Sequence, residues 1–122
     1  MKSVVQPPIK KNGTAIDGSW AKAIDLKMPV NSTITGITVN GFGSGSYPPI
    51  PIQVEIILDG VAFTVIDNEK IVSRGGGKTF HPFWIGRLQL SPFSRVTIQA
   101  FAGNFTGTDE KIELAVFNER WQ

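Results

Sequence analysis

The stretch of this sequence closest to a chemical motif is Gly75-Gly76-Gly77-Lys78-Thr79, whose ending resembles that of a phosphate-binding loop. Such a loop requires another glycine five positions before Gly77, and Val72 occupies that position. It also requires a following helix, whose amide groups and dipole face the phosphate. Aromatic, strand-like residues follow instead, so we interpret residues 73–79 as a hairpin loop and predict no nucleotide cofactor.

The only histidine, His81, precedes Pro82 and lacks the surroundings of a catalytic base. A triad requires a nucleophile and an orienting acid, and Ser73, Ser91 and Ser94 do not stand in the glycine-flanked turn that exposes a nucleophilic serine. The carboxylates are spread over turns and outward strand positions, so the sequence does not indicate which two could form the acid–base pair that cleaves sugars. We therefore predict that the protein is not an enzyme.

Composition argues against metals and nucleic acids as partners. The sequence contains no cysteine and one histidine, so it lacks the residues of the usual thiolate or multi-histidine sites. Its acidic residues lack the spacing of an EF-hand loop. The net charge of +2 over 122 residues is too small for an electrostatic binder of nucleic acid. We predict no metal site and no nucleic-acid partner.

The elements that must carry any site are strands, because apolar and polar residues alternate from Trp20 onward. In the clearest run, alternate positions from Ile50 to Leu58 are all apolar. A change of parity near Gly36 predicts a bulge, and Asp59-Gly60 predicts a hairpin turn. A further turn is expected at Asp67-Asn68. The predicted strands span residues 21–28, 33–40, 50–58, 61–66, 70–73, 80–90, 94–102 and 110–118.

These strands predict an all-β fold, an antiparallel sandwich of about eight strands. No helical periodicity supplies the crossovers that a parallel sheet needs. The connections at residues 41–49, 73–79 and 103–109 are long, which fits a Greek-key or jelly-roll winding better than a meander. The domain is expected to span residues 20–122, with 41% hydrophobic residues to fill its core.

Residues 1–19 differ from the rest and are expected to form an extended arm. Pro7-Pro8 favours an extended path, and this segment carries the whole net charge. The arm would lie either across its own domain or across a neighbour. Its candidate partner-binding residues are apolar or basic: Val4, Val5, Pro7, Pro8, Ile9, Lys10 and Lys11.

Aromatic residues crowd into the last third of the chain and supply the other candidate contacts. In the 80–90 strand, Phe83 and Ile85 share one parity while Trp84 shares the other, so both faces of the strand are apolar. Such a strand is buried on both faces, either within its own fold, with the arm covering one face, or under another subunit. The partner-binding residues predicted here are Phe83, Trp84, Phe117 and Trp121.

An alternative hypothesis is a carbohydrate-binding module or lectin, since exposed aromatic rings stack on sugars and such modules also use β-sandwiches. The candidate residues are Trp20, Tyr47, Trp84 and Trp121. The loops at residues 41–49, 73–79 and 103–108 would gather at one end of the sandwich.

Across its whole length, the combination of basic arm, cysteine-free sandwich and long polar loops resembles small viral structural proteins: the single jelly-roll capsid, penton and decoration proteins of bacteriophages. The resemblance is architectural and includes no sequence motif. It implies a non-catalytic homo-oligomer that binds other protein subunits within a virion. The N-terminus lacks the apolar stretch of a signal peptide, and no run approaches about 18 apolar residues, so we expect synthesis in a host cytoplasm and no membrane span.

Overall fold

The computed structural model describes residues 3–15, 20–28, 32–42, 49–74, 78–80, 82–91, 94–103 and 110–121. Within these ranges no helix is long and apolar enough to cross a membrane. The described residues form ten strands: β1 (Ser3–Val5), β2 (Ile9–Ala15), β3 (Ala21–Lys27), β4 (Ser32–Phe42), β5 (Ile50–Leu58), β6 (Val61–Arg74), β7 (Lys78–Phe80), β8 (Phe83–Gln89), β9 (Val96–Ala102) and β10 (Glu110–Trp121).

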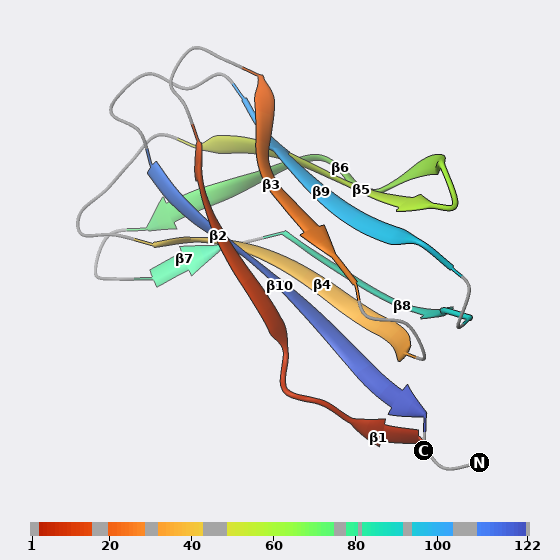
Figure 1. Ribbon diagram of the computed structural model, residues 1–122. Helices are drawn as coiled ribbons and strands as arrows, with labels where there is room; N and C mark the ends of the chain where they lie inside the picture. Colours follow the sequence, from red (N-terminus) through yellow and green to blue (C-terminus); the bar gives the residue numbers. More distant parts are fainter. Residues whose placement is uncertain are drawn as a thin grey trace.

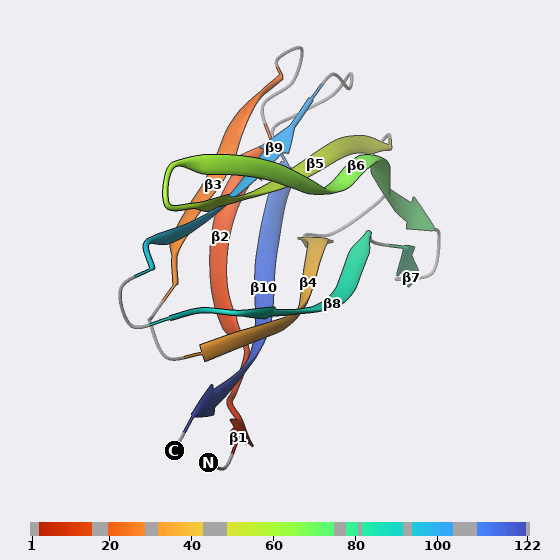
Figure 2. The ribbon, with the colours of Figure 1, turned by 90° about the vertical axis from the view of Figure 1, so that its right-hand side faces the viewer.

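The strands form two antiparallel sheets that face each other (Figures 1 and 2). In the first sheet, β10 and β4 are central, β8 lies at one edge, and β1 and β2 both pair with the other side of β10. The second sheet has the order β3-β9-β5-β6-β7. With the short β1 and β7 set aside, every connection except the β5–β6 hairpin passes from one sheet to the other. This winding is a jelly roll, which confirms the predicted fold class.

The core lies between the sheets and is built from the alternating residues of both. Along β5, Ile50, Ile52, Val54 and Ile56 are all 0% exposed, as the alternation predicts. Fully burying an aliphatic side chain of this size contributes about 1.5–3 kcal/mol. From the first sheet, the fully buried residues include Ile34, Ile37, Val39, Ile112, Leu114 and Val116.

The predicted hairpin turn at Asp59-Gly60 is confirmed. Both residues have positive φ angles, 50° for Asp59 and 86° for Gly60, as a two-residue hairpin turn that follows the strand twist requires. The Asp59 carboxylate accepts a 2.8 Å hydrogen bond from the backbone N–H of Arg95. The Asp59 N–H donates to the Arg95 carbonyl at 2.9 Å. The tip of the hairpin is therefore tied to the residue that precedes β9.

Two interruptions between strands are placed differently from the prediction. The expected turn at Asp67-Asn68 is wrong, because β6 is continuous from Val61 to Arg74. Val54 pairs with Ile66 and Ile52 pairs with Glu69, so β6 takes up an extra residue as a bulge there. The expected 80–90 strand is divided into β7 and β8, with Pro82 in the interval. Proline has no N–H to donate to a sheet.

The described part of residues 1–19 is extended and lies along its own domain, the first of the two expected courses. Ser3 pairs with Trp121, and Ile9 pairs with Val116. Figure 1 accordingly shows both chain ends beside β1. The side chain of Ile9 packs against the core. These residues therefore belong to the first sheet of the sandwich.

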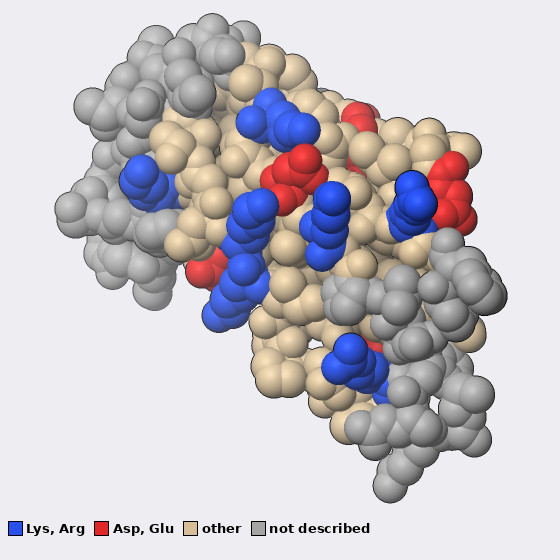
Figure 3. All heavy atoms as spheres, viewed as in Figure 1, with Lys and Arg blue, Asp and Glu red and all other residues tan. Residues whose placement is uncertain are grey.

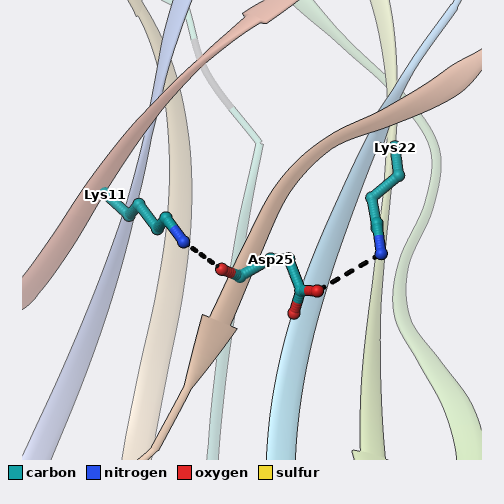
Figure 4. A network of polar contacts seen from close by, with 3 residues as sticks. All are labelled: Lys11, Lys22 and Asp25. Atoms are coloured by element: carbon teal, nitrogen blue, oxygen red, sulfur yellow. Dashed lines mark hydrogen bonds and ion pairs between the residues drawn. The ribbon is translucent and has the colours of Figure 1, made fainter.

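The edges of the two sheets meet where β2 passes β3. A side-chain Cβ at Gly13 would lie 2.3 Å from the Ala23 carbonyl oxygen, so only glycine fits this approach. Figure 4 shows the polar contacts nearby: the Lys11 ammonium donates to the backbone carbonyl of Asp25, and Lys22 lies 3.2 Å from the Asp25 carboxylate. The Lys11 hydrogen bond links β2 to β3 across this side of the sandwich, whereas the Lys22–Asp25 pair lies within β3.

Candidate functional site

Large apolar side chains are exposed on the outer face of the first sheet. On β8, Phe83 is 60% exposed and Ile85 is 77% exposed. Phe117 on β10 is 41% exposed. All three stand at positions whose parity is opposite to that of the core residues of their strands. We call Phe83, Ile85 and Phe117, together with Gly36, the outer apolar patch.

The strand register brings the patch together around Gly36. This glycine pairs with Phe117 on one side and with Ile85 on the other, so it lies between two large side chains and presents none of its own. The result is an open groove of about 420 Å³ lined by Thr35, Gly36, Ile37, Thr38, Phe83, Trp84, Ile85 and Phe117.

The predicted bulge near Gly36 is confirmed and shapes this groove. The β4–β8 register shifts between Ile34 and Gly36, and the β4–β10 register shifts between Phe117 and Asn118. A bulge adds local twist and redirects the neighbouring side chains. Here the extra residue in β4 lets Ile34 and Ile37, three positions apart, both point into the core, where both are 0% exposed.

Trp84 lines the groove, but its side chain packs against the core. A Cβ at Gly86 would lie 2.3 Å from the Trp84 indole, so the ring covers Gly86 on the inner side of β8. Of the predicted contact residues, Phe83, Trp84 and Phe117 therefore meet at one groove. Of these, Phe83 and Phe117 present exposed side chains.

Ion pairs border the patch. Arg87 of β8 lies 3.5 Å from the Glu119 carboxylate, which also accepts a 2.8 Å hydrogen bond from the Ser3 hydroxyl. On the β2 side, Lys10 lies 4.0 Å from Glu113. Exposed pairs of this kind contribute little stability, but they leave the border of the patch with balanced charge.

The two sides of the sandwich differ in character. Figure 3 shows Lys and Arg side chains gathered over β2 and β3, where Lys10, Lys11, Lys22 and Lys27 are all exposed. Lysines on edge strands discourage pairing with other chains. The edge strand β8, on the opposite side of the first sheet, carries Phe83 and Ile85 outward with Arg87 as its one charged residue. The lysines that discourage pairing with other chains at β2 and β3 are thus missing from the edge strand β8, which has one charged residue.

The remaining predicted contact residues lie apart from the groove. Val4 is half-buried, and Val5, which pairs with Glu119 at the border of the patch, is 75% exposed. Pro7 and Pro8 are exposed. Lys10 and Lys11 have polar contacts within the chain. The side chain of Trp121 lies outside the described residues. Roles for these residues in binding stay predictions.

Sequence reasoning left Ile85 and Gly36 out of the predicted contact set. Ile85 shares the parity of Phe83, and this shared parity could have indicated that Ile85 lies on the same exposed face. Gly36 contributes to the groove because β10, β4 and β8 pair in a particular register. That register cannot be predicted from the residues of any one strand.

The aromatic residues proposed for sugar stacking are not gathered on one surface among the described residues. Trp20 is 48% exposed and lies against Gly103, where a Cβ would overlap its ring. Trp84 is partly buried against the core, and Tyr47 and the Trp121 side chain lie outside the described part of the chain. No specific observation favours the carbohydrate hypothesis.

Within the described ranges, histidine and acidic side chains do not gather at one site. There, no three histidine or acidic side chains lie close enough to hold a metal ion. His81 and the Gly75–Gly77 stretch lie outside these ranges. The groove itself is lined by aliphatic, aromatic, threonine and glycine residues, so it is suited to binding an apolar surface.

No protein-family model and no curated protein matches the sequence. Among solved structures, the chain is similar to a chain in the structure of infectious bursal disease virus, Gx strain, with a TM-score of 0.50 and 12% identity over 96% of this chain and 33% of that chain. A chain of the Gt strain gives a TM-score of 0.47 and 9% identity, over 97% and 32% of the two chains. The present chain thus spans about a third of the chains it matches. The likeness is one of fold, and the predicted architectural resemblance to viral structural proteins is confirmed at that level.

Proposed function

We propose that this chain is a non-catalytic structural or assembly protein of a virus particle, such as a minor capsid, penton or decoration protein, and that it resides in the virion. The outer apolar patch would contact a neighbouring protein subunit. Support comes from the jelly-roll winding, shared with a chain of a virus structure, and from a groove suited to apolar contact.

The observation that carries the proposal is the exposure of Phe83, Ile85 and Phe117 on one face. The largest apolar patch on a typical monomer measures about 300–600 Å², and such a patch is often a functional surface. The sandwich core does not need these residues, since alternate positions on the same strands already fill it. Exposure on the outer face is thus a cost that association with another protein would remove.

The energy available fits a subunit of a repeating assembly. Burying the exposed parts of the three side chains, roughly 350 Å² at about 25 cal/mol per Å², would contribute on the order of 9 kcal/mol. Association costs about 4–15 kcal/mol in lost freedom of motion. A single contact is therefore weak, and a closed symmetric assembly, in which each subunit makes several contacts, stabilises all of them together.

The first residues of the chain have a supporting role in this proposal. Val5 is exposed and pairs with Glu119 at the border of the patch, so it would extend the contact, while β2 holds this segment to the domain.

Sedimentation velocity over micromolar to millimolar protein tests the proposal. We expect the average mass to rise with concentration towards a defined multiple of the monomer. A mass that stays at the monomer value over the whole range, in a protein shown to be folded by circular dichroism, would contradict it.

A further inference from the structure

We infer that the outer apolar patch takes a second copy of this chain, packed face to face across a twofold axis. This inference rests on the proposed function and specifies the partner.

The shape of the patch is complementary to itself. A twofold contact joins one surface to its own copy, so protrusions and recesses must occur on the same surface. Phe83 protrudes beside the groove, and Gly36 forms a recess between Phe117 and Ile85. In a face-to-face pair, Phe83 of each copy can enter the recess of the other.

The charge around the patch permits self-contact. A surface with charges of one sign repels its own copy, because like charges placed opposite each other oppose association. The cations Arg87 and Lys10 are each paired within the chain, with Glu119 and Glu113 respectively. The balanced border provides no strong attraction for an acidic or a basic partner, and it does not oppose a second copy.

The area of the patch is close to what a specific pair requires. At 60%, 77% and 41% exposure, the three side chains present roughly 350 Å² per copy, taking about 200 Å² for each full side chain. Two copies would bury roughly 700 Å² of apolar surface. Since homodimer interfaces are about 65% apolar, the total comes to roughly 1,100 Å², just above the roughly 1,000 Å² expected of a specific interface. The pair should be specific but weak.

Cross-linking of single-cysteine variants tests the geometry. The natural chain has no cysteine, so an introduced thiol has no competitor. Ile85 lies near the centre of the patch, and the centre of a twofold contact meets its own copy. Ile85→Cys should therefore form disulfide-linked dimers on mild oxidation. The matched control is Val61→Cys, at a residue of similar exposure, 67%, on the second sheet.

We expect Ile85→Cys to cross-link at least tenfold faster than Val61→Cys, and we expect a second substitution, Phe83→Ser, to abolish the difference while circular dichroism shows a folded protein. Equal rates for the two cysteine variants would overturn the twofold inference. If the wild-type mass still rises with concentration in that case, the proposed function stands and only the partner geometry is wrong. If the mass stays monomeric as well, the proposed function fails with it.

Discussion

At the scale of single residues, Trp84 and Gly86 act together on the inner side of β8. The indole packs against the core and occupies the space that a side chain at Gly86 would need. This arrangement places the large Trp84 side chain on the core-facing side of the edge strand β8, while its neighbours Phe83 and Ile85 face outward. The division between the face that packs against the core and the exposed face is thus made within a few residues.

Gly86→Ala should destabilise the fold. The new Cβ would lie 2.3 Å from the Trp84 ring, so the indole must move, and overpacking of this kind costs about 1–3 kcal/mol. Urea denaturation measures the change. The control is Gly36→Ala, whose Cβ would come no closer than 3.3 Å to a neighbouring atom, and we expect it to cost less. Equal stability losses in the two variants would contradict the assigned packing of Trp84.

The sequence predicted Phe83, Trp84 and Phe117 as contact residues, but it did not predict which face of β8 is exposed. It placed Trp84 in the contact set because β8 is apolar on both faces, and parity alone does not tell which face meets the core. That choice is made by the second sheet, whose position depends on residues far along the chain.

At the scale of elements, strong alternation predicted the central strands well. β5 has the predicted boundaries, and β3, β4 and β9 differ from theirs by one or two residues. β1 and β2 were expected only as an extended arm, because residues 3–15 contain prolines, glycine and lysines that have low strand propensity. They are strands because they pair with β10, a tertiary effect that overrides local preference.

Deletions should separate the roles of β1 and β2. A chain without residues 1–8 loses β1 and the Ser3 contact to Glu119, and we expect it to fold with a modestly lower melting temperature. A chain without residues 1–15 also loses Ile9 and the buried Ala15 and leaves one side of β10 unpaired. We expect this longer deletion to abolish cooperative thermal unfolding, followed by circular dichroism. Cooperative unfolding in both chains would show that β2 is not an integral strand.

At the scale of the whole molecule, the jelly roll gives the chain two unlike sides. The β2–β3 side is rich in lysine and closed by contacts between the sheets, whereas the β8 side exposes apolar residues beside a groove. Under the proposed function, such a difference would make each contact specific for one surface. The proposed function therefore requires that subunits associate through the outer apolar patch.

Light scattering of two double variants tests this claim most directly. Phe83→Ser with Ile85→Thr removes apolar side chains from the patch, and Val61→Ser with Phe63→Ser removes exposed apolar side chains from the second sheet. We expect the first variant to remain a folded monomer at concentrations where the wild type and the second variant associate. Association of the first variant to the wild-type mass would contradict the claim.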